Sequence, residues 1–130
     1  MSHKLHHLAL GAAEPDVLAR FYGEVFGLSE LDRHFDAQGQ LRSVWLQLQP
    51  GILMIERSER ARPPVDGVDA GLFLLAFEVA PHEREALERR LSDAGCPIES
   101  RSAFTSYARD PEGNRVAVSH YPQAQWARGF

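Results

Sequence analysis

Apolar side chains recur along this chain at two spacings, and segments with helical spacing alternate with segments that have the spacing of a strand. Between Pro15 and Gly27 they recur at helical spacing, with the proline suited to a first helical turn and the glycine to a C-terminal cap. A second and shorter helical pattern runs from Pro81 to Gly95. Each predicted helix has one apolar face, so each needs a sheet to cover that face.

Alternating patterns and short apolar runs predict strands on both sides of each helix. The clearest strand is 41–49, in which Val44 and Leu46 alternate with Trp45 and Gln47. The weakest is 28–35, where charged and titratable side chains are frequent. The predicted strands cover 5–10, 28–35, 41–49, 52–56, 72–79, 97–103, 104–109 and 114–121.

A tight turn is predicted between the last two strands, at residues 110–113. Asp110 can accept backbone hydrogen bonds at the first turn position, and Pro111 presets φ for the second. Gly113 tolerates the positive φ needed to leave the turn. We interpret this segment as a hairpin. If it has a function, the hairpin forms one wall of a ligand site.

The second half of the chain repeats the first. The two prolines that open the helices, the two glycines that close them, and the turns at 50–51 and 111–113 keep an offset of roughly 62 to 68 residues. We therefore predict an α+β fold of two strand–helix–strand–strand–strand modules. Side by side, such modules would enclose a concave sheet surface. Module one covers about 4–58, the linker about 59–71, module two about 72–121, and the tail 122–130.

Composition excludes several classes of partner. The chain of 130 residues is one domain's worth, and its formal net charge of −4 argues against a nucleic-acid surface. Cys96 is the only cysteine, so no intramolecular disulfide can form, and we expect a packed thiol in a reducing compartment. No segment approaches the ~18 apolar residues of a membrane span, and the N-terminus has no secretory signal. We expect a cytoplasmic protein with no membrane partner.

Four segments of the chain carry a resemblance to known proteins: Leu5-His6-His7-Leu8-Ala9-Leu10, Phe21-Tyr22-Gly23-Glu24-Val25-Phe26-Gly27-Leu28, Leu75-Ala76-Phe77-Glu78-Val79 and Asp110-Pro111-Glu112-Gly113-Asn114. Together they resemble the vicinal oxygen chelate superfamily, which includes glyoxalase I, bleomycin-resistance and fosfomycin-resistance proteins, and extradiol dioxygenases. The resemblance implies paired βαβββ modules that form a curved, cup-like mixed sheet with the helices outside, and a small molecule held in the cup between the modules. It makes 1–130 a single domain of this type.

Many members of that superfamily hold a divalent metal, and the resemblance locates the ligand positions in this chain. The first-strand histidine of module one matches His7, but the other positions fall on Met54, Leu74 and Ala117. Glu56 follows two residues after Met54 on the same predicted face. A divalent metal needs at least three N, O or S donors, and leucine and alanine supply none. We therefore expect no metal and no cofactor; a divalent metal is the disfavoured alternative.

The candidate ligand-binding residues combine apolar area with a few polar tips. Several have a plainer interpretation as well. His7 could be a half-buried histidine with satisfied hydrogen bonds, Glu56 a strand end in solvent, and Tyr107 an ordinary cross-strand aromatic. No catalytic residue is assigned. The candidates are His7, Trp45, Gln47, Glu56, Tyr107 and Tyr121.

Two function classes remain open at this point. One is a metal-free binding protein of the bleomycin-resistance type, and the missing metal ligands favour it. The other is a lyase, isomerase or dioxygenase of the glyoxalase kind with a remodelled metal site. In either case we expect a homodimer, because short paired modules leave sheet edges and apolar helix surface uncovered. Trp126 and Phe130 in the tail are expected to help cover that surface.

Overall fold

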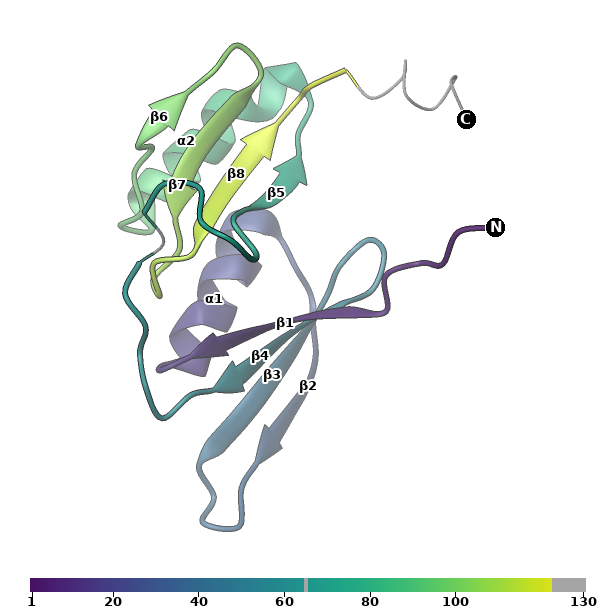
Figure 1. Cartoon of the computed structure of the whole chain (residues 1–130), viewed down its shortest axis with the longest axis vertical. Coiled ribbons are helices and arrows are strands. Elements are labelled where there is room, and N and C mark those ends of the chain that lie inside the picture. Colours follow the sequence, from purple (N-terminus) through teal and green to yellow (C-terminus); the bar gives the residue numbers. More distant parts are fainter. Residues whose placement is uncertain (65, 123–130) are drawn as a thin grey trace. The chain divides into compact units, whose positions relative to one another are not determined.

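The computed structural model describes residues 1–64 and 66–122 of the chain. It has the expected α+β class, with two four-stranded mixed sheets and one main helix for each sheet (Figure 1). The chain divides into two compact units, 1–64 with 110–113, and 65–109 with 114–130, and each unit is described by itself. Among the described residues, no helix is long and apolar enough to cross a membrane.

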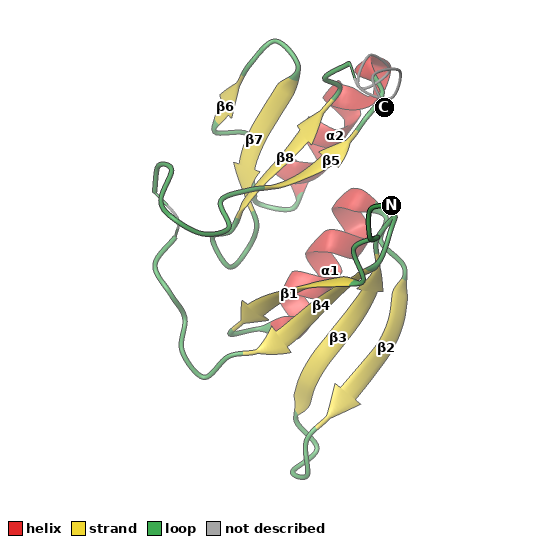
Figure 2. Ribbon diagram, turned by 45° about the vertical axis from the view of Figure 1, so that its right-hand side comes forward, coloured by secondary structure: helices red, strands yellow, loops and turns green. Residues whose placement is uncertain are grey.

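The first unit contains one complete βαβββ module. Its sheet has the strand order β1-β4-β3-β2, with β1 parallel to β4 and the other neighbours antiparallel. Figure 2 shows α1 lying across one face of this sheet. The elements are β1 (His7–Ala12), α1 (Pro15–Phe26), β2 (Glu30–Phe35), β3 (Leu41–Gln47) and β4 (Ile52–Arg57).

Helix α1 begins and ends where the sequence predicts. Pro15 occupies its first turn, and Gly27 has φ 70°, with its N–H donated to the Gly23 carbonyl. Leu18 and Tyr22 on the apolar face of the helix are fully buried. The side chains below them alternate along β3 and β4, and Val44, Leu46, Leu53 and Ile55 are buried.

The second unit repeats the order and the pairing of the first. Its sheet is β5-β8-β7-β6, with β5 parallel to β8 and the other neighbours antiparallel. Leu87 and Leu91 of α2 are buried, as are Val116 and Val118 of β8. The elements are β5 (Leu75–Glu78), η1 (Pro81–Glu83), α2 (Arg84–Asp93), β6 (Ser100–Arg101), β7 (Thr105–Arg109) and β8 (Arg115–Ser119).

Several predicted element boundaries are wrong. The first strand begins at His7 rather than at residue 5. β5 covers four residues instead of eight, because its one partner, β8, extends only from Arg115 to Ser119. Pro81 opens a 3₁₀ turn before α2 starts at Arg84. The prediction that Trp126 and Phe130 cover an interface lies outside the described residues.

The turn at Asp110–Gly113 forms as predicted. The Glu112 N–H is donated to Asp110 Oδ1 at 2.9 Å, and Gly113 has φ 88°. Although the turn lies between β7 and β8 in sequence, it clusters with the first unit. The hydroxyl of Tyr22 in α1 donates to Asp110 Oδ2 at 2.7 Å, and both residues are buried.

Candidate ligand-binding face

The face of the first sheet that points away from α1 carries four of the predicted site residues. Strand register arranges this face in rows that cross the sheet. The first row contains His7 and Gln47 on either side of Ile52. The second row contains Met54, Trp45 and Asp32, and the third contains Glu56, Ser43 and His34. Because helix α1 covers the opposite face, we call this surface the open face.

Trp45 and His34 form the most defined cluster on the open face. Their ring centroids are 4.6 Å apart at an interplanar angle of 55°. Nε2 of His34 lies 3.5 Å from Oδ2 of Asp32 without forming a hydrogen bond. Nε1 of Trp45 is also buried and has no hydrogen-bond partner among the described residues. Buried polar atoms are normally paired, so two neighbouring orphan nitrogens are unusual.

The residues on the open face do not fit the divalent metal that the resemblance implies. His7 pairs in register with Ile52, so Glu56 lies four residues farther along β4, about 13 Å away along the strand. His7 and Glu56 are therefore not neighbouring donors for one ion. Met54 offers only a soft thioether, and Leu74 and Ala117 offer no donor. Among the described residues, no group of three His, Cys, Asp or Glu side chains could hold a metal.

The two remaining candidates lie in the second unit. Tyr107 of β7 pairs with Ala117 of β8, on the face of the second sheet away from α2. Ala117 is fully buried. Tyr121 follows the end of β8, is 51% exposed, and its ring centroid lies 5.3 Å from that of Phe104. The predicted strand therefore does not reach Tyr121, and a ligand contact at Tyr107 or Tyr121 stays a prediction.

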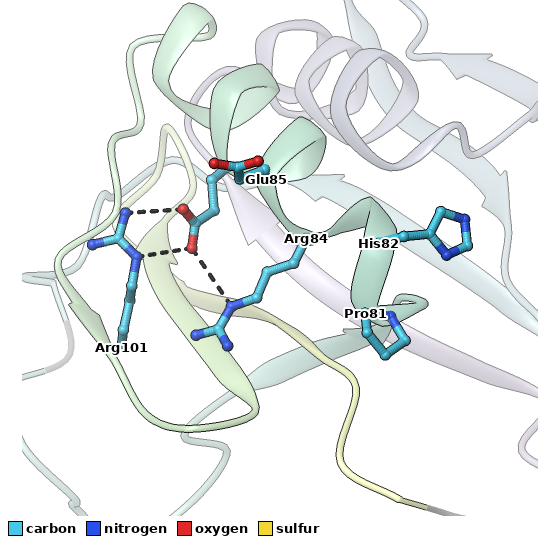
Figure 3. Close-up of a pocket in the computed structure, with 6 residues that line it drawn as sticks. Pro81, His82, Arg84, Glu85 and Arg101 are labelled. Atoms are coloured by element: carbon cyan, nitrogen blue, oxygen red, sulfur yellow. Dashed lines mark hydrogen bonds and ion pairs between the residues drawn. The ribbon is translucent and has the colours of Figure 1, made fainter.

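A pocket of about 550 Å³ lies beside α2 and was not anticipated from the sequence. In Figure 3 the guanidinium groups of Arg84 and Arg101 approach each other from α2 and β6, while His82 points away from them. Between them lies Glu88, which accepts two hydrogen bonds of 2.9 Å from Arg101 and one from Ser106. The Arg101 guanidinium, helped by the Ser106 hydroxyl, holds the pKa of the Glu88 carboxyl below its usual value.

The charged groups of this pocket are used to hold the second unit together. Arg84 donates to Ser106 Oγ and to the carbonyl oxygens of Ser102, Ala103 and Thr105. It therefore fixes the loop between β6 and β7 against the start of α2. The ion pairs described on this helix form at Glu88, with Arg84 one turn before it and with Arg101 of β6. We assign this pocket a structural role.

Two further contacts in the first unit were not foreseen. The carboxylate of Glu112 accepts hydrogen bonds from the backbone N–H groups of Ala13 and Glu14, at 2.9 and 3.1 Å. It thereby holds the chain just before α1 and places negative charge beside the positive end of that helix. In the second unit, Cys96 is buried, as expected for a packed thiol. No periodic pattern in the sequence indicates the long-range hydrogen bonds of Glu112.

The duplicated βαβββ fold, with an uncovered sheet face that gathers apolar and polar side chains, defines a protein of the glyoxalase type. The model of the Glyoxalase/Bleomycin resistance protein/Dioxygenase superfamily matches residues 4–118, and the chain belongs to this superfamily. A comparison with curated protein sequences gave no match.

Solved structures with the same fold include enzymes and resistance proteins. A mutant of the fosfomycin-resistance protein FosX from Listeria monocytogenes, complexed with Mn(II) and 1S,2S-dihydroxypropylphosphonic acid, has a TM-score of 0.78 at 15% identity, over 98% of this chain and 99% of that one. Lactoylglutathione lyase from Agrobacterium tumefaciens has a TM-score of 0.65 at 22% identity, over 91% and 93%. TioX from Micromonospora sp. ML1 has 0.64 at 21%, over 92% and 100%. These identities establish a shared fold alone.

Proposed function

We propose that this protein binds a small, partly aromatic organic molecule on the open face of its first sheet, without a chelated metal. One observation carries the proposal: His7, Trp45, Gln47 and Glu56 emerge together on the face that α1 leaves uncovered. A mostly apolar wall with a few polar groups is typical of small-molecule sites. This activity corresponds to the binding proteins of the superfamily.

The layout of the open face favours recognition by shape and apolar contact. Ile52, Met54 and Trp45 provide an apolar centre. His7 and Glu56 provide polar groups at opposite ends of it, about 13 Å apart along the strands. A ligand that touches both ends is longer than a single aromatic ring. A metal would require donors at Met54, and its side chain instead adds apolar surface to the wall.

A thermal-shift screen of aromatic and amphipathic compounds, run in EDTA, tests the proposal. Any compound that prefers the native state raises the melting temperature by mass action, and the shift should be unchanged by the chelator. His7→Ala should reduce the shift without unfolding the protein, since His7 is exposed. His3→Ala, an exposed histidine before β1, is the matched control and should leave the shift intact.

The alternative is a metal-dependent lyase, isomerase or dioxygenase, and the same preparation distinguishes it. The observation in its favour is that structural neighbours include a lyase and a Mn(II) complex. It would be established by about one Zn, Ni, Fe or Mn ion per subunit that is lost in His7→Ala, together with metal-dependent turnover of dicarbonyl–thiol adducts or catechols. That result would overturn the binding-protein proposal.

We also propose a homodimer. β1 and β2 are edge strands of the first sheet, and β5 and β6 are edge strands of the second, so each sheet has hydrogen-bonding groups at its margins. A second copy is the commonest partner for such edges. Light scattering at tens of micromolar, where typical dimers are populated, should give twice the mass of 14.6 kDa. A strictly monomeric mass would contradict this.

A further inference from the structure

We infer that Trp45 and His34 form a polar subsite that takes a neutral hydrogen-bond acceptor, a carbonyl or amide oxygen attached to an aromatic body. The inference rests on the proposed function and names the ligand chemistry of the same face. It also adds His34, on the edge strand β2, to the residues that determine specificity. It is based on Nε1 of Trp45 and Nε2 of His34, two buried nitrogens on neighbouring rings that have no hydrogen-bond partner among the described residues.

Both nitrogens act as donors. The indole N–H of Trp45 can only donate. At His34, Nε2 lies 3.5 Å from the Asp32 carboxylate oxygen, and in the tautomer that carries its proton there this nitrogen can only donate. The two donors lie on rings whose centroids are 4.6 Å apart. An acceptor oxygen placed about 2.9 Å from each nitrogen would satisfy both orphan donors.

The charges around the subsite select a neutral acceptor over an anion. Asp32 lies beside Trp45 in its row, and Glu56 lies in the row of His34, so two carboxylates share this face. A carboxylate ligand would lie beside the Asp32 carboxylate, and Glu56 on the same face adds to the repulsion. An amide or ketone oxygen accepts the same hydrogen bonds without that repulsion. Its aromatic body would rest on Trp45 and Met54, which are neighbours across β3 and β4.

Three probes of one shape test this chemistry by NMR of the ¹⁵N-labelled protein: benzamide, benzoate and benzylammonium. Benzamide should shift the indole N–H signal of Trp45 and the ring signals of His34. Benzylammonium has no acceptor and should leave the indole signal in place. The chain has two tryptophans, so the signal is assigned by its loss in Trp45→Phe. Asp32→Asn should strengthen benzoate binding more than benzamide binding, because only benzoate is repelled by the Asp32 carboxylate.

The variants measure the two donors separately. Trp45→Phe keeps an aromatic ring but removes the N–H, and it should weaken benzamide about three- to tenfold. His34→Gln should weaken benzamide to a similar extent, whereas His82→Gln, an exposed histidine of the second unit, should have no effect. If benzamide shifts His7 and other signals of the open face but not the Trp45 indole, the subsite is wrong and the proposed function stands. If no probe shifts any signal of this face up to its solubility limit, both fail.

Discussion

Helices α1 and α2 occupy equivalent positions in two modules of the same topology, but different interactions fix them. α1 is held by a broad apolar face and by the buried hydrogen bond from Tyr22 to Asp110. α2 buries only Leu87 and Leu91 and relies on the charged cluster around Glu88. A repeated fold thus does not require repeated stabilisation: α1 buries the larger apolar face, although its Asp16 also pairs with Arg33 of β2, whereas the side-chain contacts described for α2 centre on Glu88.

The faces of the two sheets that point away from the helices also differ. The first presents Trp45, His34, His7 and Glu56. The second presents Tyr107 beside Ala117, and places Arg109 directly opposite Arg115. The position that corresponds to His7 in the second module is Leu74, which has no donor. The polar chemistry expected of a ligand site is therefore concentrated in the first module, although the fold alone would allow it in either.

The largest effect that separates the modules is expected for Tyr22→Phe. The substitution keeps the ring in the core but removes the hydroxyl that donates to a buried oxygen of Asp110, which should cost about 1–3 kcal/mol of unfolding free energy. Urea denaturation measures the loss. Tyr121→Phe, at a half-exposed ring, is the control and should change stability little. Equal losses in the two variants would show that the hydrogen bond to Asp110 does not stabilise α1.

A smaller and pH-dependent effect is expected for Glu88→Gln in the second module. The variant loses the carboxylate that accepts hydrogen bonds from Arg101 and Ser106. Its free energy of unfolding should therefore be lower by about 1–2 kcal/mol at neutral pH. Because the pKa of Glu88 is lowered in the folded state, its contribution is present above the ordinary value of 4.5 and is lost as pH falls through the lowered value.

The pH dependence of that difference is measured by thermal melts of both proteins between neutral pH and pH about 3. The wild-type protein should lose more stability than Glu88→Gln over this range, so the two curves converge in acid. Asp16 and Asp36, whose pKa values are also lowered by arginine partners, contribute equally to both curves. Glu85→Gln, at an exposed position of the same helix, should follow the wild type. Curves that stay parallel would contradict the role given to Glu88.

Much of the fold was predictable because its apolar side chains recur with the period of a strand or of a helix. Alternation along 41–49 placed Trp45 and Gln47 on one face, and the structure confirms this arrangement over β3. The matched prolines and glycines located both helices and the repeat. Strand ends were less predictable, because a strand stops where its partner stops: β5 is limited by β8, whatever its own apolar run suggests.

The candidate site was predictable only in part. Alternation placed Trp45 and Gln47 on one face of their strand, and Glu56 on the face of Met54, but that these residues share a face with His7 follows from the strand register. His34 could not be selected, because β2 has a weak strand pattern and bulges shift its register. Nor could the Glu88 cluster or the pairing of Tyr22 with Asp110, which are separated by 88 positions in sequence. Such contacts depend on tertiary geometry, and no local spacing reports them.

The contact of Glu112 with the chain before α1 has a consequence for biosynthesis. The acceptor and the first N–H it receives are 99 positions apart. A ribosome adds residues from the N-terminus at about 5–20 per second, so the first module emerges several seconds before Glu112 exists. During that interval Tyr22 lacks Asp110 as well. The nascent first module therefore lacks these contacts until translation reaches the turn at Asp110–Gly113. A chain truncated before this turn would contain the first module without the hydrogen bonds to Glu112 and Asp110.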